Sequence, residues 1–325
     1  MSENSNLYPL RLCSLEDRYI WGREDFRLAD LGYRDSLIKE GWLSANSLSE
    51  VMDTYMDRVV GDFAFNAYGR QFPLQVKRIS CEGKMPLRVH PDDSTAEYRY
   101  DALGKEKVWY ILSADPKARL VLGFKEDIDA TVLLNGLQDS SIENELQLVP
   151  VKAGECYRIK PGLIHGATGS LEVLEISESS ALDFCVWPWG EELGTDEFDS
   201  ALTLIDALDF IEYRRQDPAP LQSRKLNDHV SELLNIPQFI VNKINLTDAL
   251  RISSEKTDTF AVYYCLYGRA EIKVTVDDLG EVTYPLVKDS LVLVPAEVTE
   301  MTLSPLDQTT AIIEALGQTS RQDNE

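Results

Sequence analysis

The chain has 325 residues, 44% of them hydrophobic and 27% charged, which is enough for one large or two ordinary globular domains. Its formal net charge of −23 repels phosphate backbones and anionic membranes, so we expect neither nucleic acid nor a membrane surface as a partner. The sequence has no long apolar run and no signal-peptide pattern, and its five cysteines are scattered. We therefore expect a cytoplasmic protein with reduced thiols.

The predicted elements are mostly short strands with a few helices. One helix is marked by a capping box in which Ser47 is followed by Glu50, and a second is expected to begin at Ser94, where the box pattern recurs. Glycines and prolines separate the strands predicted in this half, which are Leu74–Ser80, Leu87–His90, Val108–Leu112, Ala118–Gly123, Glu155–Ile159 and Leu171–Ser177. Short strands at this spacing are typical of an antiparallel barrel or jelly roll.

A further helix is predicted at about Phe198–Arg215, and the sequence DPAP at residues 217–220 breaks it. A second group of strands follows, at Phe239–Leu246, Phe260–Tyr267, Ala270–Val276, Val282–Leu286, Ser290–Val294 and Thr310–Glu314. This group contains no histidine, which favours a structural or dimer-forming role. We expect two strand-rich domains, residues 1–215 and 222–325, joined by a linker at 216–221.

Three motifs in the first domain carry the chemistry. VHPDD at residues 89–93 ends one strand, GKEKVWY at 104–110 enters the next, and PGLIHG at 161–166 follows downstream. In this order and at these separations they resemble the type I mannose-6-phosphate isomerases of the short bacterial form, zinc enzymes of the cupin superfamily. Further segments share the likeness, namely YIWG at 19–22, FPLQVK at 72–77, KAGE at 152–155 and LEIS at 174–177.

The resemblance implies a mainly β fold of two cupin (jelly-roll or β-barrel) domains with a few helices. It also implies a zinc ion held by a Gln and a His of the first motif, the Glu of the second and the His of the third. His90 and His165 match the two histidines, but Arg88 stands at the Gln position and Lys107 at the Glu position. Cys185 stands where the family has an Arg, and we interpret it as a buried thiol.

These replacements argue against zinc, which binds groups with a free lone pair. Arginine has no acceptor atom, and lysine could ligate only after losing its proton. A +1 group about 4 Å from a dication would be repelled by roughly 8 kcal/mol at an effective dielectric of 20. Glu106 lies one residue out of register and is expected to face the other side of the strand. We therefore expect no cofactor, with His90 and His165 as the ligands if a metal is retained.

The first interpretation of function is a diverged member that binds a sugar, a sugar phosphate or another anion without isomerising it. The candidate binding residues are Arg88, Lys105, Lys107, Trp21 and Trp109. In a simpler version of this interpretation, Arg88 and Lys107 only form ion pairs and the pocket binds no ligand. The expected partners of these ion pairs are Asp92, Asp93 and Glu175.

Two other interpretations stay open. One is an active mannose-6-phosphate isomerase with altered metal ligation, in which Glu106 or Glu175 joins the two histidines and Lys105 is the candidate catalytic residue. The other is a different cupin epimerase or isomerase that uses His90 or His165 as its base. The sequence leaves open whether the chain is an enzyme.

Overall fold

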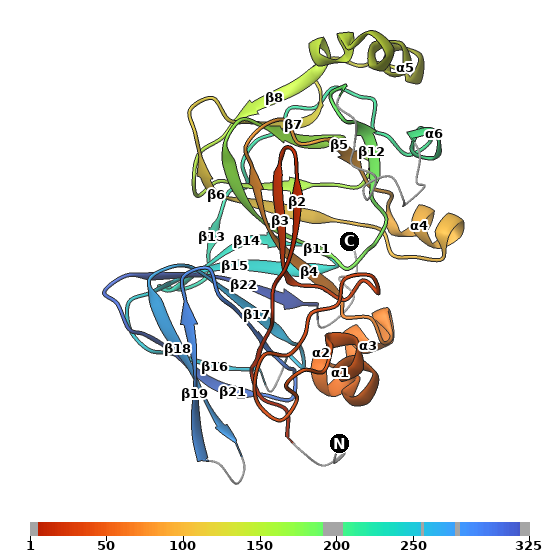
Figure 1. The fold of residues 1–325 in the computed structure, drawn as a ribbon. Helices are drawn as coiled ribbons and strands as arrows, with labels where there is room; N and C mark the ends of the chain where they lie inside the picture. Colours follow the sequence, from red (N-terminus) through yellow and green to blue (C-terminus); the bar gives the residue numbers. More distant parts are fainter. Residues whose placement is uncertain (1–5, 191–203, 255–256, 277–279, 319–325) are drawn as a thin grey trace. The chain divides into compact units, whose positions relative to one another are not determined.

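The computed structural model describes residues 6–190, 204–254, 257–276 and 280–318, and its strands form four sheets (Figure 1). The chain divides into two compact units. We call residues 16–26 and 75–221 the motif barrel, because this unit carries the three motifs, and residues 1–15, 27–74 and 222–325 the C-terminal barrel. Residues 27–74 thus group with the C-terminal strands and not with the motifs they precede.

The motif barrel is built from a six-stranded and a five-stranded antiparallel sheet. The first has the order β2 (Leu15–Tyr19), β3 (Gly22–Leu28), β4 (Leu74–Cys81), β11 (Leu171–Glu178), β6 (Lys107–Ala114) and β9 (Cys156–Ile159). The second has the order β12 (Phe184–Trp187), β5 (Leu87–Val89), β10 (His165–Thr168), β7 (Arg119–Phe124) and β8 (Leu146–Pro150). An apolar core between them takes side chains from both sheets, including Ile79 of β4 and Leu122 of β7.

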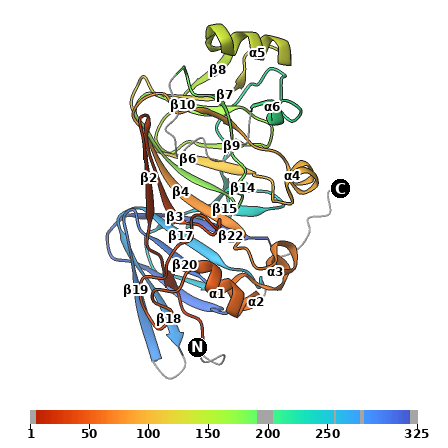
Figure 2. The same ribbon diagram turned by 45° about the vertical axis from the view of Figure 1, so that its right-hand side comes forward.

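The same unit contains short helical segments, which are α4 (Asp93–Tyr100), α5 (Ala130–Asp139), the 3-10 turn Ser141–Asn144 and α6 (Leu204–Ala207). Both views show α5 beside β8 (Figures 1 and 2). The expected helix start at Ser94 is wrong, because Asp92 caps α4 through its side chain, which accepts from the backbone N–H of Thr95 at 2.8 Å.

The helix expected at about 198–215 is wrong over most of its described part. Residues 198–203 lie outside the described residues, and α6 ends at Ala207. The backbone beyond it hydrogen-bonds to the motif barrel instead: Glu212 N–H donates to the carbonyl of Gly162 and Ile128 N–H donates to the carbonyl of Tyr213. These tertiary hydrogen bonds replace those a helix would make.

The C-terminal barrel also consists of two antiparallel sheets. Its seven-stranded sheet has the order β1 (Leu10–Arg11), β20 (Leu291–Val294), β17 (Ala261–Tyr267), β22 (Thr310–Gly317), β15 (Phe239–Leu246), β14 (Val230–Asn235) and β13 (Arg224–Lys225). Its four-stranded sheet has the order β16 (Leu250–Ser253), β21 (Glu300–Pro305), β18 (Arg269–Val276) and β19 (Gly280–Val287). An apolar core that draws on both sheets, with Tyr263 and Ile272 among its members, fills the space between them.

Three helices belong to the same unit: α1 (Leu48–Tyr55), α2 (Asp57–Val60) and α3 (Asp62–Tyr68). The predicted capping box of α1 is confirmed, with the side chains of Ser47 and Glu50 each accepting the other's backbone N–H. No helix among the described residues is long and apolar enough to cross a membrane. The fold is therefore mainly β with two barrels, as predicted.

Candidate functional site

The six-stranded sheet directs a row of charged side chains into the motif barrel. Lys107 and Trp109 alternate along β6 and so share one face. Glu175 on β11 lies directly opposite Trp109 in the strand register, and Lys77 lies on the neighbouring β4. All four residues are at most 5% exposed.

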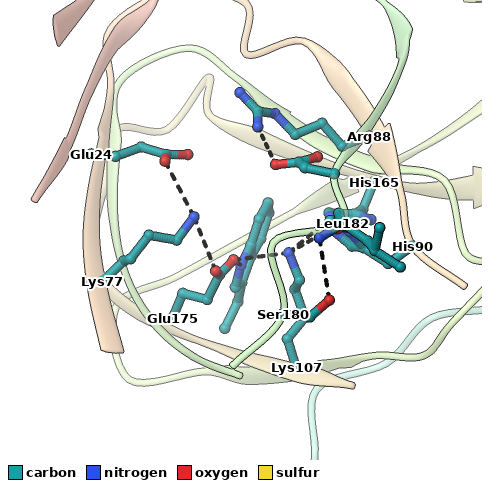
Figure 3. Close-up of polar contacts among 11 residues, drawn as sticks. Glu24, Lys77, Arg88, His90, Lys107, His165, Glu175, Ser180 and Leu182 are labelled. Atoms are coloured by element: carbon teal, nitrogen blue, oxygen red, sulfur yellow. Dashed lines mark hydrogen bonds and ion pairs between the residues drawn. The ribbon is translucent and has the colours of Figure 1, made fainter. Parts of the chain in front are cut away.

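The other sheet supplies both histidines. Arg88 on β5 pairs in register with His165, the first residue of β10, and His90 follows Arg88 by two residues. The rings of His90 and His165 are 5.1 Å apart between centroids. Figure 3 shows both rings turned toward the side chain of Lys107. We call this group of buried and half-buried titratable side chains the polar cluster. It consists of Glu24, Lys77, Arg88, His90, Lys105, Lys107, His165, Glu175 and Asp183.

Lys107 lies at the centre of the polar cluster. Its Nζ atom is 2.9 Å from Nε2 of His90, 3.3 Å from Nε2 of His165 and 3.2 Å from Oε2 of Glu175 (Figure 3). Burial lowers the pKa of Lys107, and the carboxylate of Glu175 opposes this shift. Three acceptors surround the nitrogen, and only the ammonium form carries three hydrogens to satisfy them.

Both histidines are held as neutral rings. Nδ1 of His90 lies 2.8 Å from the carbonyl oxygen of Leu182, and Nδ1 of His165 lies 2.9 Å from that of Leu163. Because a carbonyl oxygen only accepts, each Nδ1 carries the proton and each Nε2 presents a lone pair to Lys107. Burial and the nearby Lys107 charge lower the pKa of His165 to about 3 and hold the pKa of His90 well below its usual value.

A second lysine shares Glu175. Nζ of Lys77 lies 3.2 Å from Oε1 of Glu175 and 3.2 Å from Oε2 of Glu24. Burial disfavours the charged amine, but the two carboxylates raise the pKa of Lys77 above its ordinary value. Burial likewise disfavours the ionised carboxyl of Glu175, yet the surrounding lysines and the Trp109 N–H, 2.6 Å from Oε2, keep its pKa well below normal. Glu175 is thus a fixed anion between two cations.

Lys105 differs from the other two lysines. It is 4% exposed, and its side-chain amine has no hydrogen bond or ion pair within the described part of the chain. Burial, together with repulsion from Lys107 and Lys77, lowers the pKa of Lys105 to about 7. Lys105 is therefore a buried amine that is partly charged near neutral pH.

Arg88 and Asp183 form the more accessible end of the polar cluster. Arg88 donates from its guanidinium to Oδ2 of Asp183, and the two side chains are 16% and 26% exposed. Burial opposes ionisation of Asp183, but Arg88 keeps its pKa well below the usual value. The other charged members named above are at most 6% exposed.

The ion-pair partner predicted for Lys107 is confirmed, but the partner of Arg88 differs from the prediction. Lys107 pairs with Glu175, one of its expected partners. Arg88 pairs with Asp183, whereas Asp92 caps α4 and Asp93 accepts from the backbone N–H of Gly104.

The remaining candidates make other contacts in the motif barrel. Trp21 stacks on Tyr19 at 4.9 Å within the apolar core, and Trp109 meets the ring of His165 edge-on at 5.5 Å. Glu106 accepts from Nε of Arg158 at 2.6 Å. The interpretation of Cys185 as a buried thiol is wrong: it is half-buried, because it lies opposite Arg88 in the register of the outermost strand, β12.

Sequence analysis missed Glu24, Lys77 and Asp183. Lys77 could have been found, because it alternates with Gln75 as a buried polar residue along a predicted strand. Glu24 and Asp183 carried no comparable signal, since each is placed by pairing with distant strands.

The residues present do not fit the zinc ion that the resemblance implies. The Nε2 lone pairs of both histidines and one oxygen of Glu175 face the Lys107 ammonium, a cation in the position a metal would need. Arg88 offers no lone pair. Among the described residues, no three His, Cys, Asp or Glu side chains are grouped so that they could hold a metal ion.

Two antiparallel barrels, with a histidine-bearing cluster inside one of them, correspond to a cupin fold. No protein-family model matches the chain. Its sequence is 26% identical to the mannose-6-phosphate isomerase of Streptococcus mutans over 302 residues, covering 88% of this chain and 92% of that one. It is 22% identical to mannose-6-phosphate isomerase ManA of Bacillus subtilis, covering 85% and 89%. The chain is thus similar in sequence to mannose-6-phosphate isomerases over most of its length.

Solved structures agree in fold. The mannose 6-phosphate isomerase of Bacillus subtilis has a TM-score of 0.80 at 19% identity, covering 95% of this chain and 99% of that one. The apo form of the Salmonella typhimurium enzyme has a TM-score of 0.71 at 12% identity, covering 96% and 100%. These structures show that the chain shares their fold.

Proposed function

We propose that the motif barrel binds a sugar, a sugar phosphate or a related anion through its polar cluster, without zinc-dependent isomerisation. The observation that carries this proposal is Lys105, a buried amine without a counterion among the described residues. The chain would act in the cytoplasm, in line with its five free cysteines.

The charges of the polar cluster support an anionic ligand. It contains four basic side chains (Lys77, Arg88, Lys105 and Lys107) and three carboxylates (Glu24, Glu175 and Asp183). The pairs described above satisfy every cation but Lys105. An unpaired buried charge is costly, so an arriving phosphate or carboxylate would stabilise the protonated amine and be stabilised by it.

The accessible end of the polar cluster supports the same class of ligand. Arg88 has a planar guanidinium suited to a phosphate or to sugar hydroxyls, and Asp183 accepts hydrogen bonds from hydroxyls. In this proposal the polar contacts come from Arg88, Lys105 and Asp183. Trp21 and Trp109 contribute apolar surface beside them.

The same lysine favours a second candidate. The relatives are named as mannose-6-phosphate isomerases, and moving a proton between C1 and C2 of an aldose needs a base with a pKa near the working pH. Lys105 has such a pKa, whereas the shifted pKa values of His165 and Glu175 make both weak bases. A metal-free isomerisation would therefore depend on Lys105.

Calorimetry and thermal denaturation with mannose 6-phosphate, mannose and inorganic phosphate test the proposal. We expect mannose 6-phosphate to bind the wild type and raise its Tm, and Lys105→Gln to weaken binding at least tenfold. The matched control is Lys152→Gln, which removes the same charge from an exposed position in the same unit.

Equal binding by wild type and Lys105→Gln would contradict the proposed site, and binding by neither would contradict the ligand class. A coupled assay for fructose 6-phosphate separates the two candidates. Turnover that survives chelation of metals but is lost in Lys105→Gln would establish the isomerase in place of the binding protein.

A further inference from the structure

We infer that the ammonium group of Lys107 is a built-in cation that takes the place of a divalent metal between His90 and His165. The inference goes beyond anion binding and does not depend on which ligand the polar cluster accepts. It concerns what holds two neutral imidazoles and a buried carboxylate together in the interior of the motif barrel.

The first argument is the geometry around Nζ of Lys107. Two ring nitrogens and one carboxylate oxygen surround it at 2.9, 3.3 and 3.2 Å. Nitrogen and oxygen atoms with free lone pairs are also what a divalent transition metal selects. The ammonium uses its three hydrogens where a metal would use its vacant orbitals.

The second argument is the support behind each acceptor. Both histidines donate their Nδ1–H to backbone carbonyls, of Leu182 and Leu163, and Trp109 donates to Glu175. Such outer hydrogen bonds orient the ligands of metal sites and fix the histidine tautomer. The acceptors are therefore pre-oriented toward a cation, and the chain supplies that cation from position 107.

The third argument is charge. A dication beside the ammonium would be strongly repelled, because two like charges at contact distance are poorly screened in a buried site. Lys77, whose Nζ binds the other oxygen of Glu175, adds to this repulsion. The Lys107 ammonium and a metal ion thus exclude each other.

The same geometry predicts that replacing the ammonium with a carboxylate creates a metal site. In Lys107→Glu a carboxylate would replace the ammonium on the same strand position and point toward the same two ring nitrogens. Two imidazoles with one or two carboxylates are a donor set that zinc accepts. One substitution should therefore convert an internal ion pair into a metal site.

The experiment compares wild type, Lys107→Glu and Lys107→Gln after removal of metals with a chelator. Each is titrated with Zn²⁺ by calorimetry and with Co²⁺ by visible absorption. We expect no stoichiometric binding by wild type, one equivalent per chain with Lys107→Glu, and a Tm of Lys107→Glu that rises with zinc. Lys152→Glu makes the same charge change at an exposed position and should bind no metal.

Lys107→Gln keeps the test decisive if Lys107→Glu does not fold. It removes the ammonium without adding a charge and puts an amide oxygen at position 107, so the two freed histidines and this oxygen should bind Zn²⁺ more tightly than the wild type does. Stoichiometric zinc in the wild type that is lost in His165→Ala would overturn the inference. So would the absence of metal binding by a folded Lys107→Glu, or by a folded Lys107→Gln if the former cannot be made.

Discussion

Trp109 donates its indole N–H to Oε2 of Glu175 across 2.6 Å, and the same oxygen lies 3.2 Å from Nζ of Lys107. The other oxygen of Glu175 is 3.2 Å from Nζ of Lys77. One fully buried carboxylate on β11 therefore joins three side chains from the two strands that flank it, β4 and β6. If the negative charge of Glu175 is removed, the positive charges of the buried Lys107 and Lys77 are less well neutralised.

We expect Glu175→Gln to lower the free energy of unfolding by about 3 to 5 kcal/mol, the range for breaking a buried ion pair from one side. The matched control is Glu172→Gln on the same strand, where the half-exposed carboxylate accepts from Arg78 at 2.7 Å and should contribute less than about 1 kcal/mol. Urea denaturation of both variants checks the difference. Similar losses in the two would show that Glu175 is not the centre of a coupled ion network.

The two buried histidines should make the protein sensitive to acid. A histidine whose pKa is lowered by folding stabilises the fold above its unfolded pKa, and that contribution is lost as the pH falls toward the folded pKa. For His165 the unfolded value is about 6.5 and the folded value about 3. By pH 5 the His165 ring should therefore cost about 2 kcal/mol, and His90, whose pKa is lowered in the same direction, should add to this loss.

Denaturant unfolding at pH 5 and pH 7.5 measures this loss, and His165→Gln isolates one ring. The variant should be less stable than the wild type at pH 7.5 but lose about 2 kcal/mol less on acidification. An equal loss in both proteins would mean that His165 is protonated in the folded state.

Some of this site could be predicted from the sequence, because local patterns determine it. The resemblance that the motifs carry implies that His90 and His165 share a site, and strand alternation places Lys107 and Trp109 on one face. The partner of Arg88 could not be predicted. Asp183 precedes a short strand whose register with β5 shifts between Cys185 and Trp187, and such shifts have no clear sequence signal.

The C-terminal barrel offers a pH effect of opposite sign. Asp30 is 6% exposed and accepts the backbone N–H of Phe72 at 2.8 Å. Burial, with a further contribution from nearby carboxylates, raises the pKa of Asp30 to about 6. A carboxyl group with a raised folded pKa stabilises the fold below its unfolded pKa, and that contribution is lost as the pH rises through 6.

The free energy of unfolding of Asp30→Asn should therefore equal that of the wild type near pH 4. At pH 8 it should exceed the wild-type value by about 1 to 2 kcal/mol, a figure reduced for residual solvent screening. Asp57→Asn, at an exposed position of the same unit that does not contribute to the shift of Asp30, should show no such pH-dependent gain in stability. Thermal unfolding across this range gives the comparison. A variant less stable than the wild type at pH 8 would mean that the ionised carboxylate is itself stabilising.

Lys105 makes anion binding depend on pH. Its pKa of about 7 means that the amine is mostly protonated at pH 6 and mostly neutral at pH 8. Sulfate is the appropriate probe, because it stays a dianion throughout this range while phosphate changes its own charge near pH 6. We expect the affinity for sulfate to fall about tenfold from pH 6 to pH 8, following the fraction of protonated Lys105.

In Lys105→Gln the binding should be weak and nearly independent of pH, whereas Lys152→Gln should reproduce the wild-type profile. A flat profile in the wild type would show that Arg88 and the other cations, which stay charged, account for the binding without Lys105.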